Sequence, residues 1–305
     1  MCRVGDQIAP QRPPVMRHLC LALALALGGG AAWSDAGKTP VRKAFRVCKA
    51  PHNMPFTNAR GEGFEDRLAA LFARELGLPL ETYSFPQRLG FIRNTLRYKL
   101  PGSDYPCDIV MGVPAGFDQV MTTKPYYRST YVMVFPAGKK LKGVNSEADF
   151  LGLSPERLAA LKIGVFDRSP GAAWLEKRKL ADSAVYYRMM NADPDEHPSD
   201  IVERELAQGR IDAAVVWGPI GGYFAHRAGS DDLRVVRLAS EPGIHFNYAI
   251  AMGVRYGEKA WKQQIEGLID RKRGEIEAIL HDYGVPLLPE SGAAPTEAVR
   301  QAGAR

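Results

Sequence analysis

The chain has 305 residues, of which 46% are hydrophobic, and a formal net charge of +6. This length and composition are sufficient for two globular domains with a sizeable core, and they exclude a largely disordered chain. The 40 basic and 34 acidic residues are interspersed along the sequence. A nucleic-acid-binding protein would gather its basic residues into a stripe or patch, so this class is not favoured.

The N-terminus has the pattern of a secretory signal peptide. Arg17 and His18 precede the apolar run LCLALALALGGGAAW, which is followed by small residues up to Ala36. The run is too short to span a bilayer comfortably and ends in a small-x-small cleavage pattern. We therefore predict a signal peptide over residues 1–36 and a soluble, periplasmic mature protein, with the true start at either Met1 or Met16.

The rest of the chain alternates between strand-like and helix-like segments, which is typical of an α/β protein. Apolar and β-branched runs predict strands over residues 45–50, 80–85, 107–113, 162–167, 184–190, 211–218 and 233–238. Helical periodicity predicts helices over residues 64–77, 88–100, 172–180 and 199–209, followed by two C-terminal helical segments. The Ala/Gly/Pro-rich tail, residues 289–305, is predicted to be disordered.

Two longer strands, residues 128–135 and 245–254, interrupt this alternation. If both cross between two lobes, they form a hinge, and a ligand crevice lies at the carboxyl ends of the parallel strands. Lobe 1 would then comprise residues 45–131 and 245–288, and lobe 2 residues 132–244. The expected architecture is the two-lobed periplasmic binding protein type II fold, in which each lobe is a mainly parallel sheet with helices on both faces.

Several motifs resemble those of the amino-acid-type (family 3) extracellular solute-binding proteins. They are Pro55-Phe56, Gly63-Phe64-Glu65-Asp66, residues 107–112, Pro125-Tyr126-Tyr127, residues 209–213 and Tyr283-Gly284-Val285. Three longer stretches, residues 85–97, 108–132 and 215–225, resemble the J proteins (MoxJ and XoxJ) of bacterial methanol oxidation clusters. This resemblance implies an accessory partner of a periplasmic, pyrroloquinoline-quinone-dependent methanol dehydrogenase, without alcohol oxidation by the chain itself.

Two positions depart from the amino-acid binders. The resemblance places Gln119 where those proteins use an arginine to hold the ligand carboxylate, and Trp217 where they use an acidic residue for the ligand ammonium. A zwitterion bound here would leave both of its charges unpaired. Amino-acid binding is therefore disfavoured, and the alternative to the accessory role is an ABC-transporter receptor for a small solute that is not an amino acid.

The candidate ligand-binding residues are those that the predicted topology places at the crevice. They are His52, Asn53, Phe56, Arg88, Pro114, Gln119, Tyr126, Arg128, Ser169, Trp217, Asn247 and Tyr248. Two of them have a simpler interpretation. Ser169 precedes a helix and could cap it instead of presenting backbone amides to an anion. Trp217 could be a core residue instead of a ligand platform.

An enzyme, a metal site and a bound cofactor are all disfavoured by the sequence. The histidines show no metal-ligand spacing. The chain contains neither the GxSxG motif nor a phosphate-binding loop, and no paired acid and base stand out. We therefore assign no catalytic residue, metal or cofactor.

Cys48 and Cys107 remain after Cys2 and Cys20 leave with the signal peptide. In a doubly wound strand order of 2-1-3, the strand that holds Cys48 and the strand that Cys107 begins are neighbours, and the periplasm favours disulfides. A disulfide and a pair of small buried side chains are both compatible with the sequence.

Overall fold

The computed structural model describes residues 42–189, 196–229 and 232–289. They all belong to one compact unit, residues 39–305. The predicted signal peptide lies outside the described residues. The predicted tail also lies outside them, except for Pro289. In the described part of the chain, no helix combines the length and the apolarity that are needed to cross a membrane.

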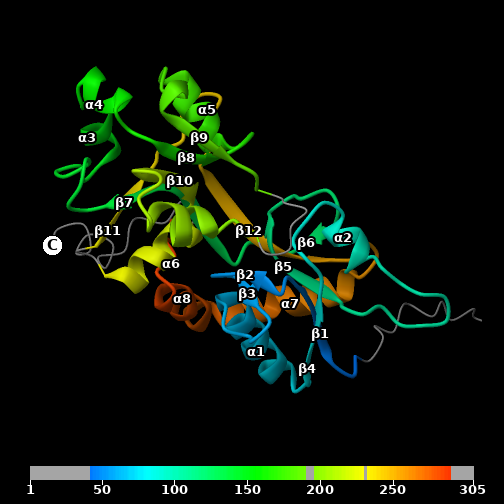
Figure 1. The fold of residues 1–305 in the computed structure, drawn as a ribbon. Coiled ribbons are helices and arrows are strands. Elements are labelled where there is room, and N and C mark those ends of the chain that lie inside the picture. Colours follow the sequence, from blue (N-terminus) through cyan, green and yellow to red (C-terminus); the bar gives the residue numbers. More distant parts are fainter. Residues whose placement is uncertain (1–41, 190–195, 230–231, 290–305) are drawn as a thin grey trace, which may run out of the picture. The chain divides into compact units, whose positions relative to one another are not determined.

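The strands are β1 (Phe45–Lys49), β4 (Leu80–Ser84), β5 (Ile109–Pro114), β6 (Met121–Thr122), β7 (Tyr127–Pro136), β8 (Ile163–Phe166), β9 (Ala184–Tyr187), β10 (Ala213–Trp217), β11 (Leu233–Arg237) and β12 (Asn247–Val254). They form one sheet in the order β4-β1-β5-β12-β7-β10-β8-β9, with β6 paired to β12 and β11 paired to β7 (Figure 1). A separate hairpin consists of β2 (His52–Asn53) and β3 (Thr57–Asn58).

The sheet has two parallel halves joined by an antiparallel centre. Strands β4, β1 and β5 are parallel, as are β10, β8 and β9. Between the halves, β12 and β7 run antiparallel to each other and to their outer neighbours β5 and β10. The predicted 2-1-3 order is confirmed for β4-β1-β5, and β12 and β7 are the two long strands of the predicted hinge. The lobe boundaries themselves stay a prediction.

The helices are α1 (Phe64–Leu76), α2 (Phe91–Asn94), α3 (Glu147–Leu151), α4 (Pro155–Ala159), α5 (Pro170–Lys177), α6 (Gly218–Ala228), α7 (Lys259–Arg271) and α8 (Arg273–Asp282). A 3₁₀ turn covers Ala181–Ser183, and a π-helix covers Ile201–Leu206. Two sequence predictions are corrected here. The helix expected over residues 88–100 is only the single turn α2, and the helix expected over residues 199–209 is the π-helical segment.

Side chains alternate between the two faces of each sheet half, so each half is covered on both sides. In β1, Phe45 and Val47 face a core formed with α1, α7 and α8, whereas Cys48 faces a smaller cluster with α2. In β10, Val215 faces α5, and Val216 faces α6 and the π-helix. This alternation follows from the pleat of a strand, and it explains why these strands read as continuous apolar runs.

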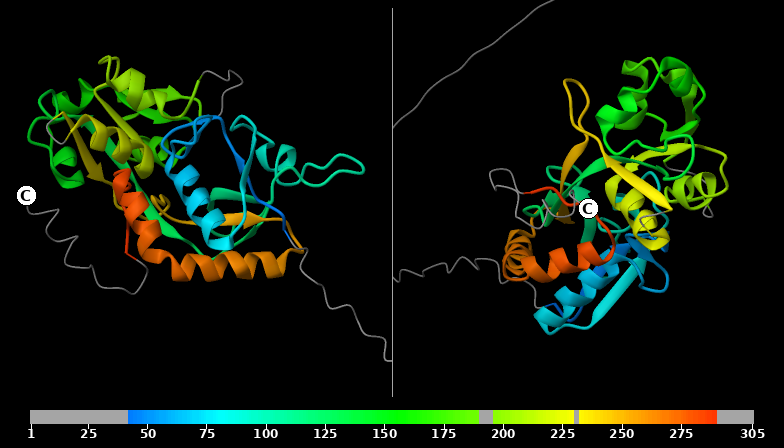
Figure 2. Two further views of the ribbon diagram at one scale, coloured as in Figure 1. Left: turned by 90° about the horizontal axis from the view of Figure 1, so that it is seen from below. Right: turned by 90° about the vertical axis from the view of Figure 1, so that its left-hand side faces the viewer.

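The segment that follows α8 fastens the central strands to α6 (Figure 2). The Ser129 hydroxyl donates to the Pro286 carbonyl at 2.8 Å, and Leu288 N donates to the Arg128 carbonyl at 2.9 Å. Helix α6 and the segment that follows α8 approach so closely that a Cβ at Gly222 would lie 2.1 Å from the Gly284 carbonyl oxygen. Glycine is therefore required at position 222 for steric reasons.

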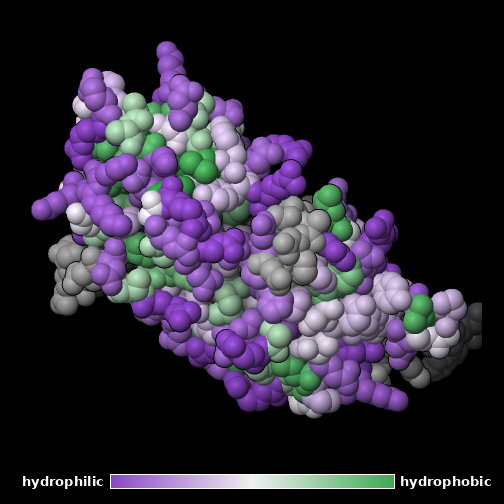
Figure 3. Space-filling model, viewed as in Figure 1, coloured by the Kyte–Doolittle hydropathy of each residue, from purple (hydrophilic) through white to green (hydrophobic). Residues whose placement is uncertain are grey.

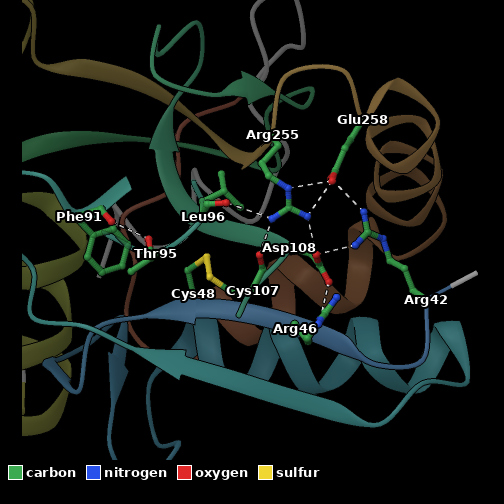
Figure 4. Close-up of a disulfide and its surroundings, with 10 residues drawn as sticks. All are labelled: Arg42, Arg46, Cys48, Phe91, Thr95, Leu96, Cys107, Asp108, Arg255 and Glu258. Atoms are coloured by element: carbon green, nitrogen blue, oxygen red, sulfur yellow. Dashed lines mark hydrogen bonds and ion pairs between the residues drawn. A yellow bond between two sulfur atoms is a disulfide. The ribbon is translucent and has the colours of Figure 1, made fainter. Parts of the chain in front are cut away.

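Cys48 and Cys107 form a disulfide with a Cα–Cα distance of 5.3 Å (Figure 4). This confirms the disulfide interpretation of the two cysteines. It joins β1 to Cys107, two residues before β5, and closes a loop with a sequence separation of 59. The loop contains α1, β4 and α2, so the bond ties together most of the first sheet half.

Asp108, next to the disulfide, is 1% exposed and is held by three arginines (Figure 4). Its carboxylate lies 2.7 Å from Arg42, 2.9 Å from Arg46 and 2.5 Å from Arg255. Burial alone would raise the pKa of Asp108, but the hydrogen bond from Arg255 and the neighbouring guanidinium charges outweigh it and lower the pKa. Arg255 also donates to the Cys107 carbonyl, so this cluster and the disulfide fix the same turn.

We expect the double substitution Cys48→Ser and Cys107→Ser to lower the free energy of unfolding by about 2–4 kcal/mol, because the unfolded chain regains the entropy of an open loop. Urea unfolding monitored by circular dichroism measures this loss. The wild type should lose a similar amount when reductant is added, whereas the double variant should not respond to reductant. A wild type that is insensitive to reductant, with both thiols free by alkylation and mass spectrometry, would contradict the disulfide.

Candidate functional site

Aromatic rings gather where the two sheet halves meet. Trp217, the last residue of β10, packs edge-on against Tyr131 of β7 at 5.6 Å and Tyr248 of β12 at 5.8 Å between ring centroids. Tyr131 and Tyr248 lie 6.3 Å apart. Trp217 and Tyr248 are half-buried. Trp217 packs against the cores of both halves, which agrees with its interpretation as a core residue, and its role at a ligand crevice stays a prediction.

The β2–β3 hairpin brings two more predicted residues to the same junction. Phe56, in the hairpin turn, packs against the core of the first sheet half and against the cluster around α6. The exposed ring of His52 stacks on His197, with 5.4 Å between centroids. His197 precedes the π-helix, so residues that are 145 positions apart in sequence are in contact across the junction. The hairpin therefore contacts elements of both halves.

Tyr126 and Tyr127 enter β7 and are both buried. The Tyr126 hydroxyl accepts a hydrogen bond from Gly112 N at 3.2 Å. No hydrogen bond of normal length and angle reaches the Tyr127 hydroxyl from the described residues, although the Trp217 indole lies close enough to it to offset part of the rise in its pKa that burial causes. A buried hydroxyl without a partner is unusual, because burial removes its bonds to water without replacing them.

Glu65 is a second buried polar group, and its carboxyl forms no hydrogen bond or ion pair with the described residues; the sequence analysis did not select it. It lies in the first turn of α1 and is 8% exposed. A Cβ at Gly112 would lie 2.3 Å from its carboxylate oxygen Oε1, so the carboxyl lies against the backbone of β5 near the carboxyl end of that strand. Gly112 itself is exposed. The Glu65 carboxyl therefore lies next to an open position at the edge where the fold is expected to bind ligands.

The protonation of Glu65 reflects this setting. Burial, with a smaller contribution from the charge of Asp66, raises the pKa of Glu65 to about 8. No cation in the described residues opposes this shift. The same carboxyl also raises the pKa of Tyr126 and of Tyr127, after the larger effect of burial. These three groups are thus near enough to influence one another.

The carboxylate of the neighbouring residue Asp66 already has hydrogen-bond and ion-pair partners within the protein. Its carboxylate accepts from the backbone of Asn58 and Gly63, both at 3.1 Å, and from Lys49 Nζ at 2.6 Å. It therefore caps α1 and neutralises the buried Lys49. Because acidic residues are common in the first turn of a helix, the sequence alone does not distinguish the capping Asp66 from the unpartnered Glu65.

Other predicted site residues lie elsewhere or have structural partners. The Ser169 hydroxyl accepts from Ala172 N at 3.2 Å, so Ser169 is the N-cap of α5, as the simpler interpretation held. Arg88 is exposed and stacks on Phe85, 5.2 Å from the ring centroid. Gln119 is also exposed. Within the described part of the chain, these three residues make no ring contact, hydrogen bond or ion pair with the ring cluster around Trp217.

The remaining four belong to the strands near the junction. Pro114 is exposed at the end of β5, and Asn53 pairs with Thr57 in the hairpin. Arg128 is half-buried and lies opposite Ala249 in the β7–β12 pair. Asn247 is exposed, and its backbone amide donates to the Ser240 hydroxyl. Among the described residues, no group of three or more histidine, cysteine or acidic side chains is arranged to hold a metal ion.

The chain is similar over most of its length to the MoxJ proteins. It is 30% identical to the protein MoxJ of Methylorubrum extorquens AM1, over 86% of this chain and 85% of that protein. It is 26% identical to the protein MoxJ of Paracoccus denitrificans, over 81% of this chain and 90% of that protein. The chain belongs to the MoxJ family. No family model matches it.

Solved structures agree with this relationship. The periplasmic binding protein XoxJ from Methylobacterium extorquens AM1 is 33% identical, with a TM-score of 0.64 over 81% of this chain and all of that one. An ancestral cationic amino acid solute-binding protein has a TM-score of 0.59 over 80% of this chain and 96% of that one, at 18% identity. The latter supports the fold alone, which is the predicted type II periplasmic binding protein fold.

We expect Glu65→Gln to become more stable relative to wild type as the pH rises from about 4.5 to about 8. In this range unfolded wild type releases the Glu65 proton and the folded protein keeps it, so wild-type stability falls with pH. The gain of the variant should not exceed about 5 kcal/mol. Urea unfolding at several pH values measures it. Glu81→Gln, which changes an exposed acid on β4, should show no such trend, and a pH-independent difference for Glu65→Gln would contradict the assignment.

Proposed function

We propose that this protein is a periplasmic, solute-binding-like accessory protein of a pyrroloquinoline-quinone-dependent methanol or alcohol dehydrogenase. It acts by binding the dehydrogenase, or a ligand, at the junction between the two sheet halves. Membership of the MoxJ family is the observation that carries this proposal. The similarity to the periplasmic binding protein XoxJ, over the whole length of that chain, supports the periplasmic location.

The site chemistry supports a role other than amino-acid capture. Trp217, where an amino-acid binder would have an acid, is packed between Tyr131 and Tyr248. Gln119, where such a binder would have its arginine, is exposed. The aromatic rings offer a large contact area to a protein segment or an organic ligand. The face of the molecule in Figure 3 is mostly hydrophilic, with apolar residues in small separate patches, so that face offers no broad apolar surface for a partner.

A receptor for an ABC transporter is the second candidate. The observation that favours it is the fold, because an amino acid ABC transporter substrate-binding protein from Streptococcus pneumoniae also resembles this chain, with a TM-score of 0.54. Such a receptor would bind a small solute and would not retain a dehydrogenase. We do not propose an enzyme, because the solved relative XoxJ is a periplasmic binding protein.

We expect the affinity-tagged protein, isolated from the periplasm of cells that also produce a methanol dehydrogenase, to retain that dehydrogenase. Trp217→Ala should retain much less, because it removes the central ring of the junction. Trp217→Phe should retain an intermediate amount, and Tyr256→Ala, which removes an exposed aromatic ring outside the cluster, should behave like wild type. Quantitative mass spectrometry of the co-purified proteins measures retention, and thermal unfolding verifies that each variant is folded.

In the opposite result, the purified wild-type protein would carry no dehydrogenase but would contain a small solute in stoichiometric amount. This would overturn the accessory role and favour the transporter receptor. Oxidation of alcohols by the isolated protein would contradict both proposals.

A further inference from the structure

Two buried polar groups at the junction lack the partners that burial normally requires. The Tyr127 hydroxyl has no hydrogen bond among the described residues. The Glu65 carboxyl, 8% exposed, has neither a hydrogen-bond donor nor a cation among the causes that set its ionisation. Buried polar groups of this kind are expensive in free energy and call for an explanation. A ligand that brings the missing partner is one such explanation.

The position of Glu65 fits a ligand better than a structural role. The carboxyl lies against Gly112, an exposed glycine with φ +70° near the carboxyl end of β5. Any side chain at position 112 would collide with the carboxylate, and most would also be strained by this positive φ. The neighbouring Tyr126 hydroxyl accepts from Gly112 N, so its own proton is directed elsewhere. The backbone of β5 thus leaves Glu65 accessible from the side of Gly112.

The charges around Glu65 indicate which ligand would bind. The buried Lys49 is already paired with Asp66 at 2.6 Å, and Arg67, two residues after Glu65, is paired with Asp282 at 2.9 Å. The other groups that influence Glu65, or that it influences, are Asp66, Tyr126 and Tyr127, and none of them carries a positive charge. An anionic ligand would be repelled by Asp66 and by ionised Glu65. A neutral ligand can pair with protonated Glu65, but only a cation compensates the charge of the ionised carboxylate.

Aromatic rings pack around Tyr127, which lies near enough to Glu65 for this carboxyl to raise the pKa of the tyrosine. Phe64 contacts Phe56 at 5.2 Å and Tyr127 edge-on at 6.2 Å between centroids. Tyr127 in turn is near Trp217. Ring faces attract cations, and aliphatic chains pack well against rings. A carboxyl group beside aromatic rings is the arrangement that recognises an organic ammonium ion.

We propose that Glu65 is the anionic anchor for an alkylammonium group, which it binds next to Gly112 with the Tyr127 hydroxyl as a second contact. The inference rests on the proposed function in one respect, since it specifies the class of ligand that the junction binds. The ammonium donates hydrogen bonds to the Glu65 carboxylate and to the Tyr127 oxygen, and its alkyl chain extends along the aromatic rings.

The test compares three probes of equal chain length, n-butylammonium, 1-butanol and butyrate, by ligand-observed NMR with the full mature chain. Wild type should bind n-butylammonium with an affinity about 10- to 100-fold higher than that for 1-butanol, as expected for a charge-assisted hydrogen bond, and should not bind butyrate. Glu65→Gln should lose this preference and keep any weak affinity for the alkyl chain. Glu81→Gln should retain the preference. Tyr127→Phe should weaken n-butylammonium binding several-fold, and thermal unfolding verifies that this variant is folded.

A pH series adds a readout that a merely structural role would not change. The amine stays protonated while Glu65 ionises near pH 8, so n-butylammonium should bind more tightly at about pH 9 than at about pH 6. In Glu65→Gln the affinity should be independent of pH. Tighter binding of 1-butanol than of the amine, no amine binding, or a preference that survives in Glu65→Gln would overturn the inference. None of these results would affect retention of the dehydrogenase, so the inference and the proposed function fail separately.

Discussion

The antiparallel pairing of β7 with β12 is the constraint on which the rest of the structure depends. Its register places Tyr127 opposite Ile250 and Thr130 opposite Asn247. Both strands lie in the middle of the sheet, so the hydrogen-bonded path between the two parallel halves of the sheet runs through them. Any relative movement of the halves must bend this pair. Tyr127, Tyr131 and Tyr248 lie on these two strands, and Trp217 packs against the last two of them, so such bending would act directly on the candidate site.

The sheet could be predicted because its signals are local and repeated. Continuous apolar runs marked the buried strands, and two unusually long strands marked the crossing pair. The short helix α2 could not be predicted, since Thr95 ends it by donating its hydroxyl to the Phe91 carbonyl. This bond competes with helix continuation. Leu96 is then fully buried in the cluster with the disulfide, a long-range contact that sequence periodicity does not reveal.

The location of a candidate site residue could be predicted from the sequence where the strand order alone determines it. Phe56, Trp217 and Tyr248 follow strand ends or lie on the crossing strands, and they do gather at the junction. Position did not decide the role of Ser169, which is used as a helix cap. Glu65 was missed for a different reason. Its neighbour Asp66 has the same charge and the same place in the helix, and only contacts with distant Gly112 and Lys49 separate their roles.

Two buried carboxyl groups, those of Asp108 and Glu65, have opposite electrostatic surroundings. Asp108 is surrounded by three guanidinium groups, which lower its pKa and hold it as an anion within the protein's own structure. Glu65 is equally enclosed but receives no such partner, and its pKa rises to about 8. A purely structural site would gain stability by replacing Glu65 with an apolar or amide side chain. Retaining the carboxyl there is advantageous only if positive charge arrives from outside the chain, which an ammonium group at the junction would supply.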